Sequence, residues 1–202
     1  YNSPAFIDIK GSFNIDGNNN NIIADVMSYV DIDNVKVHIT VNEKTTTGNF
    51  TQDYGLKEFH HVMMKMFPDA EGSTASFKTG EHQRFEFTHD MNLTFVEEME
   101  DLEIAVWIQD IETREIYNSR YLYEYCKHPY PAQNLQVTDD GNLTISWEAP
   151  EQGNPLGYNL YVNNELVLEN TTELTYTVEN SEAIYGVEVV ALYENNVTSI
   201  GL

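Results

Sequence analysis

The chain has 202 residues, of which 41% are hydrophobic and 12% aromatic, and its formal net charge at pH 7 is -23. This apolar content is enough to bury a core, which excludes a wholly disordered chain. The charge excludes a nucleic-acid-binding surface, because phosphate binding needs a field of Lys and Arg side chains. It also disfavours anionic membrane surfaces, and no apolar run approaches the length of a membrane span, so membrane insertion is not expected.

Alternation of apolar and polar residues dominates the first 125 residues. In residues 34–43, four aliphatic residues share one face while Lys36, His38 and Thr40 share the other, which is the period of a half-buried strand. Residues 95–103 are a helical candidate, although their acidity also suits a loop. Further strands, separated by turn-forming Asn, Gly and Asp clusters, are expected at residues 5–15, 21–30, 74–90, 102–110 and 115–125. About seven strands over this length is typical of a β-sandwich.

A change in charge marks a domain boundary. Residues 131–202 contain 11 acidic and no basic side chains, against 22 acidic and 10 basic in residues 1–130. Two prolines make residues 128–132 a short, stiff linker. A second pattern of alternating segments follows, with a two-residue hairpin turn expected at Asn163-Asn164, since Asn tolerates positive φ. The sequence therefore predicts an all-β protein with two tandem β-sandwich domains, residues 1–127 and 133–202.

The second domain resembles a fibronectin type III domain over nearly its whole length. The stretches "LTISWEAP", with Trp147 and Pro150, and "YGVEVVALYENN" carry the resemblance. It implies that Trp147 is a core residue, on one strand face with Leu143 and Ile145. It also implies that the chain stops as the last strand of that domain begins, so this domain is expected to be incomplete.

The first domain resembles the C-terminal, immunoglobulin-like region of a family of Bacteroidota surface and secreted proteins, named after a twenty-eight-kilodalton outer-membrane protein. The resemblance covers roughly residues 3–125. It is carried by the patterns F-x-x-V-x-x-K-M-x-P-D-x-x-G and V-x-x-Q-D followed by T-[KR]-E-[VI]. Here these are Phe59, Val62, Lys65, Met66, Pro68, Asp69, Gly72, Val106, Gln109, Asp110, Thr113, Arg114, Glu115 and Ile116. The family implies no catalytic residues, a thioredoxin-like domain upstream in many members, and often a sorting domain for type IX secretion.

The segment "EFHHVMMKMF" has the residue types of a copper site. In a regular strand, however, His60 and His61 point to opposite faces. One face would carry His60, Val62, Met64 and Met66, and the other would carry Phe59, His61, Met63, Lys65 and Phe67. Same-face neighbours lie about 6.6 Å apart, too far to share one ion without help from another strand. Packing is therefore the favoured interpretation, with Pro68-Asp69 opening a turn, and copper is the alternative.

Calcium is the second metal candidate, because three turn regions cluster hard oxygen donors. The candidate ligands are Asp16, Asp31, Asp33, Asp139 and Asp140. An EF-hand loop is excluded at Asp16, since its sixth position is Asn21 and its twelfth is Met27. Ordinary polar turns are the competing explanation, and no other cofactor is expected.

No catalytic motif is found in the sequence, and Cys126, the single cysteine, is expected to be an inert thiol. The prediction is a non-catalytic binding or spacer segment of a larger secreted or cell-surface protein, on the extracellular side of the outer membrane. Its expected partners are other domains of the same longer chain or surface proteins. The alternative is a set of ancillary modules of a secreted enzyme or redox protein whose active domain lies upstream of Tyr1. The strand-like start at Tyr1 is the reason to expect a longer chain.

Overall fold

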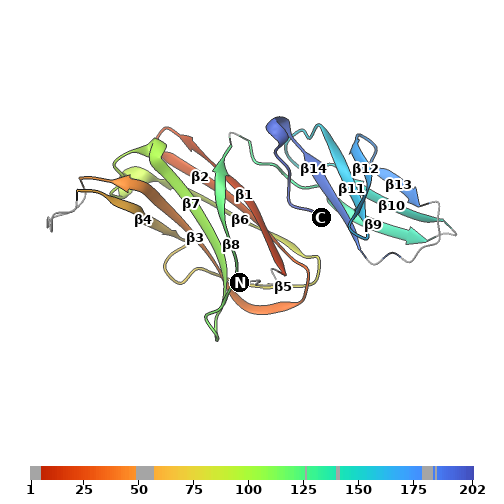
Figure 1. The fold of residues 1–202 in the computed structure, drawn as a ribbon, viewed down its shortest axis with the longest axis horizontal. Coiled ribbons are helices and arrows are strands. Elements are labelled where there is room, and N and C mark those ends of the chain that lie inside the picture. Colours follow the sequence, from red (N-terminus) through yellow and green to blue (C-terminus); the bar gives the residue numbers. More distant parts are fainter. Residues whose placement is uncertain (1–5, 49–56, 126, 140–141, 179–183, 185) are drawn as a thin grey trace. The chain divides into compact units, whose positions relative to one another are not determined.

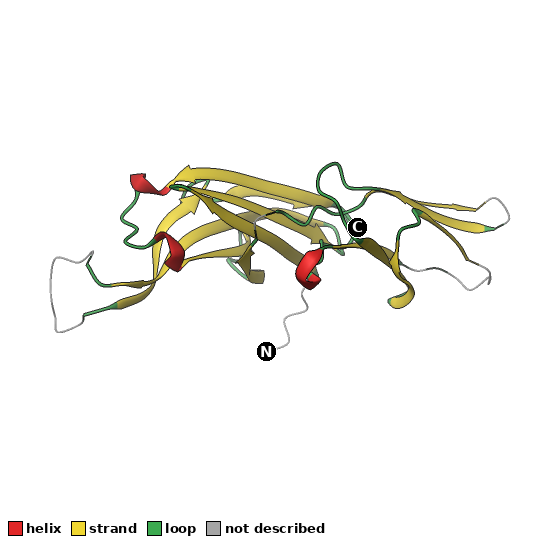
Figure 2. Ribbon diagram, turned by 90° about the horizontal axis from the view of Figure 1, so that it is seen from above, coloured by secondary structure: helices red, strands yellow, loops and turns green. Residues whose placement is uncertain are grey.

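The computed structural model describes residues 6–48, 57–125, 127–139, 142–178, 184 and 186–202. The chain is all-β and divides into two compact units, Tyr1–Cys126 and Lys127–Leu202. Apart from short 3₁₀ turns, the regular structure is strand (Figure 1, Figure 2). The segment predicted as a linker, residues 128–132, belongs to the second unit: Ala132 lies in its core, and the Tyr193 hydroxyl donates to the Tyr130 carbonyl at 2.6 Å.

The first unit is an eight-stranded sheet that folds over its own core. Its strand order is β4-β3-β7-β8-β1-β2-β6, and β5 pairs with β3 beside β4. One half of the sheet consists of β3, β4, β5, β7 and β8, and the other of β1, β2 and β6. The two halves join where β8 runs parallel to β1 at Ser12 and Phe13. The strands are β1 (Ile7–Asp16), β2 (Asn19–Ser28), β3 (Ile32–Thr46), β4 (Phe59–Phe67), β5 (Ser73–Phe77), β6 (His82–Asp90), β7 (Leu102–Asp110) and β8 (Ile116–Glu124).

Alternation explains how this sheet makes a core. On β3 every second residue from Val35 to Val41 is at most 1% exposed, and on β7 the same holds from Ile104 to Ile108. These side chains pack in one cluster with Ile7 and Ile9 of β1 and with Ala24 and Val26 of β2, so the two halves face each other in a sandwich-like arrangement. The helical candidate over residues 95–103 forms no α-helix, and the loop alternative describes it better. The 3₁₀ helix η1 (Met91–Leu93) precedes this segment, η2 (Met99–Asp101) lies within it, and β7 begins at Leu102.

The second unit consists of two three-stranded sheets around a separate core. Their orders are β13-β10-β9 and β12-β11-β14. The elements are β9 (Gln133–Asp139), β10 (Leu143–Glu148), β11 (Gly157–Val162), β12 (Glu165–Thr171), β13 (Thr175–Val178), β14 (Val187–Leu192) and the 3₁₀ helix η3 (Glu194–Asn196). Beyond η3 the chain turns back along β14, since Val189 and Leu202 exchange backbone hydrogen bonds of 3.0 and 3.1 Å.

Two local predictions for this unit are confirmed. Asn163 and Asn164 have φ of 52° and 66° and connect β11 to β12. Trp147 is 3% exposed and packs edge-on against Tyr158, with ring centroids 6.0 Å apart.

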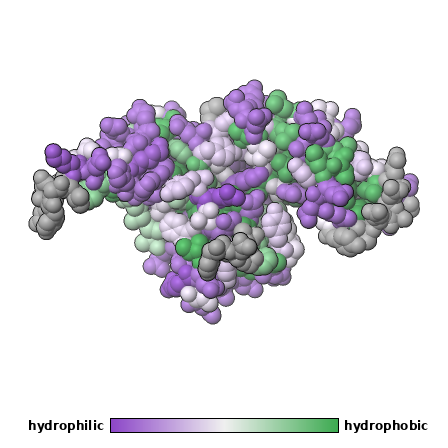
Figure 3. Space-filling view, in the orientation of Figure 1, coloured by the Kyte–Doolittle hydropathy of each residue, from purple (hydrophilic) through white to green (hydrophobic). Residues whose placement is uncertain are grey.

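Apolar side chains also reach the visible surface of this unit (Figure 3). Its exposed large apolar residues include Val137, Leu156, Leu166 and Leu174.

Candidate functional site

The outer face of the β3-β7-β8 half is the candidate functional site. Side chains that alternate with the core residues of these strands point to this face. Strand register places two rows across it: His38, Trp107 and Ser119 in one row, then Thr40, Ala105 and Tyr121 in the next. Each row therefore carries one large ring, and the two rings come from different strands.

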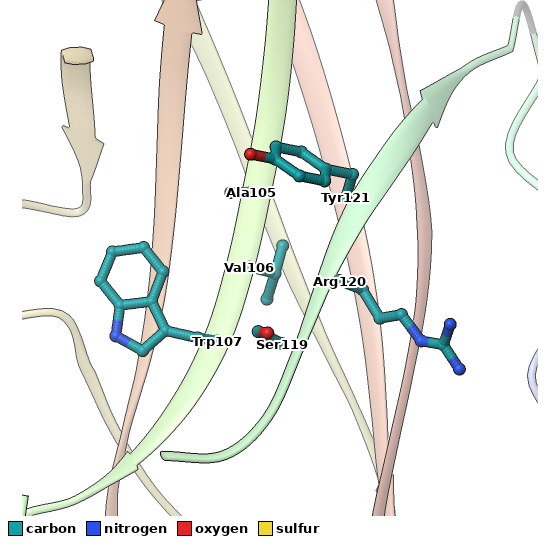
Figure 4. A pocket seen from close by; sticks show the side chains of 6 residues that line it. All are labelled: Ala105, Val106, Trp107, Ser119, Arg120 and Tyr121. Carbon is teal, nitrogen blue, oxygen red and sulfur yellow. The ribbon is translucent and has the colours of Figure 1, made fainter. Parts of the chain in front are cut away.

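A depression lies between these two rings. It has a volume of about 370 Å³ and is lined by Ala105, Val106, Trp107, Ser119, Arg120 and Tyr121. Figure 4 shows the Tyr121 ring reaching back across β7 and the Trp107 ring leaning toward β3, while Arg120 extends away from both. The small side chains of Ala105 and Ser119 leave the space between the rings open. We call this depression the aromatic groove.

Trp107 is held in place from beneath. Its indole stacks on the imidazole of His38, with centroids 4.9 Å apart and planes 13° apart. His38 is 7% exposed, and Gly72 lies so close that a Cβ there would be 2.8 Å from His38 Nδ1. Burial lowers the pKa of His38 below its ordinary value, so the ring is neutral at pH 7. One wall of the groove is therefore rigid and uncharged.

The opposite wall is more accessible. Tyr121 is 62% exposed, and Tyr123, two residues further along β8 on the same face, is 38% exposed. Burial raises the pKa of Tyr123 to about 12, and its ring meets that of Tyr125 edge-on at 6.3 Å. The aromatic surface thus continues along β8 beyond the groove. Exposed aromatic rings around a small concave space are the features of a binding site, since they offer apolar area at low entropic cost.

The sequence-predicted calcium ligands lie in different places. Asp16 ends β1, while Asp31 lies beyond the far end of β2, a ten-residue strand about 30 Å long. Asp139 ends β9 in the second unit, and Asp140 lies outside the described residues. Among the residues that the structure describes, no group of three or more His, Cys, Asp or Glu side chains is arranged to hold a metal ion. Calcium binding stays a prediction.

Asp31 and Asp33 lie near one cation instead. The Asp31 carboxylate accepts the backbone N–H of Thr79 at 2.9 Å and lies 3.1 Å from Lys78 Nζ. These hydrogen bonds, the one from Thr79 first, lower the pKa of Asp31. The hydrogen bond from Lys78 to Asp31 raises the pKa of Lys78, and the charges of Asp31 and Asp33 act in the same direction. These contacts tie the turn before β3 to the turn before β6.

The histidine- and methionine-rich segment forms β4, and the turn predicted at Pro68-Asp69 is confirmed. His60 contacts Thr45 and Glu58, whereas His61 Nδ1 lies 2.6 Å from Glu103 Oε1, so the two rings have different partners. The predicted strict alternation of faces is wrong at one point. Val41 pairs with Lys65 but Asn42 pairs with Met63, so Met64 is an extra residue in a β-bulge.

The bulge changes which side chains reach the core. Met64 packs against the core cluster, and Phe67, three residues later, belongs to it. Regular alternation would have placed these two residues on opposite faces. The copper alternative is not tested by these contacts. Cys126 lies outside the described residues.

Two buried acids were missed by sequence reasoning. Asp25 is 1% exposed, and its Oδ1 lies 2.7 Å from Arg84 Nε and 2.9 Å from His82 Nε2, across the β2–β6 pair. Glu43 is completely buried on β3, where its Oε1 accepts the backbone N–H groups of Glu97 and Glu98 at 2.9 and 2.6 Å. Neither contact is visible in local sequence patterns, because the partners lie 54 to 59 residues away.

Glu43 is the more unusual of the two. Its second oxygen is buried without a hydrogen-bond partner among the described residues. Burial raises the pKa of Glu43, and the neighbouring Glu97 and Asp101 carboxylates act in the same direction. The folded state therefore favours the protonated form more than the unfolded chain does. Through its hydrogen bonds with Glu97 and Glu98, the Glu43 side chain holds the segment before β7 against β3.

The comparisons with known proteins give structural neighbours only. No family model matches the chain, and no curated protein matches it significantly. A domain of the outer membrane lipoprotein Omp28 from Porphyromonas gingivalis matches at 14% identity and a TM-score of 0.42, covering 62% of this chain and 96% of that one. HBP35 of Porphyromonas gingivalis matches at 9% identity and a TM-score of 0.49, covering 96% of this chain and 62% of that one.

A third neighbour is a GH3 beta-glucosidase from Bifidobacterium adolescentis, with 18% identity, a TM-score of 0.29, and coverage of 57% of this chain and 16% of that one. With TM-scores below 0.5, these similarities carry no inference about family or function. Among the described residues, no helix is long and apolar enough to cross a membrane.

Proposed function

We propose that the chain is a non-catalytic binding segment of a larger surface or secreted protein, and that the aromatic groove is its binding site. One observation carries this proposal: two rings from neighbouring strands, one half-buried and one 62% exposed, flank a concave space on an outer sheet face. A sandwich does not need this arrangement for its own stability, because the core lies on the opposite side of the same strands. Exposed aromatic residues around a concavity are typical of ligand contact.

We also propose that the first unit belongs to the Bacteroidota family named after a twenty-eight-kilodalton outer-membrane protein. The two sequence patterns quoted above support this assignment, and they fall on β4 with its following turn and on β7 with the start of β8. The assignment implies a location on the extracellular side of the outer membrane. For the second unit, the sheets β13-β10-β9 and β12-β11-β14 have the strand order of a fibronectin type III sandwich, which supports that resemblance.

The proposal is tested by binding to envelope material. The purified chain, labelled at its amino terminus, is titrated onto washed outer membranes from a Bacteroidota species. We expect saturable binding that is about tenfold weaker for Tyr121→Ala. Tyr29→Ala is the matched control, since Tyr29 is 47% exposed in the turn after β2 and does not line the groove. Binding that is unsaturable, or equally strong in Tyr121→Ala, contradicts the proposal.

A further inference from the structure

We infer that the aromatic groove binds an uncharged pyranose ring of a glycan. This inference rests on the proposed function and names the class of ligand for the same site. A pyranose presents a face of C–H groups and a rim of hydroxyl groups. A site for it therefore needs aromatic faces for the C–H groups and small polar groups for the rim.

The geometry of the groove meets the first requirement. Trp107 pairs with Ser119, and Ala105 pairs with Tyr121, so the two rings occupy diagonal positions on β7 and β8. Diagonal neighbours across an antiparallel pair lie about 7–8 Å apart. The remaining two corners carry the small side chains of Ala105 and Ser119. A sugar ring can therefore lie over β7 against one of the two aromatic rings, with the other aromatic ring beside it. Pockets of about 300–1,000 Å³ suit small ligands, and this one has about 370 Å³.

The polar groups meet the second requirement. Ser119 places an exposed hydroxyl across from Trp107, and the Tyr121 ring carries its own hydroxyl over β7 (Figure 4). Each can donate one hydrogen bond and accept others, which matches a sugar hydroxyl. Both are uncharged hydroxyl groups, as the rim of a neutral sugar requires.

The charge distribution selects an uncharged sugar. Arg120 is the one charged residue among those lining the groove, and it extends away from the two rings (Figure 4). The chain as a whole carries a formal charge of -23, so polyanionic glycans are repelled at long range. A cationic ligand would find no carboxylate among the lining residues. The remaining class is a neutral glycan.

The rigidity of Trp107 favours this role over adaptable contact with a protein. The indole stacks on the His38 ring, and the backbone of Gly72 lies close to that imidazole, so the indole has a packed support before any ligand arrives. Such preorganisation lowers the entropic cost of binding a small ligand. A stable protein interface needs about 800 Å² per partner. The groove is instead an open depression of about 370 Å³ flanked by two rings, a size that suits a single sugar ring.

Affinity electrophoresis of the full chain tests the inference. The gels contain starch, laminarin, xyloglucan, galactomannan or yeast mannan as neutral glycans, and heparin or polygalacturonate as acidic ones. We expect at least one neutral glycan to retard the chain, with binding about tenfold weaker in Tyr121→Ala. Tyr121→Phe keeps the ring and should bind within about threefold of wild type, and Tyr29→Ala should be unchanged. Ser119→Ile fills the groove and should also abolish retardation.

Circular dichroism melting of each variant shows that the fold is retained. Retardation by acidic glycans alone, or by no glycan, overturns the inference, as does retardation that Tyr121→Ala leaves unchanged. Treatment of the outer membranes with periodate, which cleaves vicinal diols, separates this inference from the proposed function. Envelope binding that depends on Tyr121 but survives periodate overturns the glycan inference alone. Envelope binding that does not depend on Tyr121 overturns both.

Discussion

The indole of Trp107 lies flat on the imidazole of His38, with ring centroids 4.9 Å apart and an angle of 13° between the planes. These residues face each other on β3 and β7, which makes His38 part of the support of the groove. A pair stacked so closely should be sensitive to the charge of the imidazole. Protonation would add a buried charge beneath the indole, which is unfavourable for the folded state.

The first prediction concerns pH. Burial lowers the pKa of His38 below 6.5, helped by the charges of Lys36 and Arg114 and opposed by Glu71. Because the fold holds the neutral form, the stability linked to His38 is fully present above pH 6.5 and is lost as the pH falls through 6.5 toward the lowered pKa. In a Trp147→Phe background, Trp107 fluorescence should change with a midpoint below pH 6.5. His38→Gln should lack this transition, and a midpoint at or above 6.5 would contradict the argument.

The second prediction concerns the glycine beneath His38. Gly72 and Gly80 both have positive φ, of 66° and 75°, so alanine at either position costs about 1–2 kcal/mol for the backbone alone. At Gly72 the new Cβ would also lie 2.8 Å from His38 Nδ1, whereas at Gly80 nothing lies within 4 Å. Gly72→Ala should therefore lower the free energy of unfolding of the first unit by about 1–3 kcal/mol more than Gly80→Ala. Equal midpoints in urea for the two variants would show that His38 moves aside freely.

The third prediction concerns the buried acid on β3. Burial raises the pKa of Glu43 above its ordinary value of 4.5. Its contribution to stability is therefore fully present below pH 4.5 and is lost as the pH rises through the raised pKa. Glu43→Gln keeps an oxygen for the backbone N–H groups of Glu97 and Glu98 but cannot ionise. Relative to wild type, this variant should gain stability as the pH rises above 4.5.

Two comparisons check this assignment. Glu43→Leu removes the acceptor and should be about 1–3 kcal/mol less stable than Glu43→Gln at every pH, because neither variant titrates and the N–H groups of Glu97 and Glu98 lose their partner in Glu43→Leu. Thermal melts of the three proteins across the pH range give the measurement. A stability difference between Glu43→Gln and wild type that does not vary with pH would show that Glu43 is not the titrating group.

Much of the fold follows from local patterns in the sequence. Alternation in residues 34–43 and 102–110 predicts the two central strands, because one face of each must be buried whatever the partner strand is. The turn at Asn163-Asn164 follows from the tolerance of Asn for positive φ. The bulge at Met64 could not be predicted, because it depends on how β4 aligns with β3.

The candidate site could not be predicted for a related reason. Trp107 and His38 are 69 positions apart, and only the pairing of β3 with β7 brings them together. The same holds for Tyr121, which borders the groove because Ala105 lies opposite it. The sequence drew attention to clustered histidines and carboxylates instead, since those stand close together along the chain. Sites on the outer face of a sheet combine residues from several strands, so these residues lie far apart in the sequence and form no local motif.

The last prediction concerns the core of the second unit. Trp147 is 3% exposed and packs against Tyr158, Ile145 and Leu160 in a cluster that is separate from the core of the first unit. Trp147→Ala should cost about 3–5 kcal/mol, a large part of the roughly 5–15 kcal/mol that stabilises a small domain. The second unit should therefore melt at a much lower temperature or be partly unfolded. The first unit should keep its own transition.

Tryptophan fluorescence separates the melting of the first unit from the melting of the second. The chain contains two tryptophans, so in Trp147→Ala the remaining indole is Trp107, which reports on the first unit alone. Its thermal transition should match that of the first unit in Trp147→Phe, while far-ultraviolet circular dichroism should show an additional early loss of strand signal. Trp147→Phe is the matched control, because it keeps an aromatic ring in the same core. If Trp147→Ala melts like wild type by circular dichroism, the indole does not anchor this core, and the packing described for β10 and β11 is wrong.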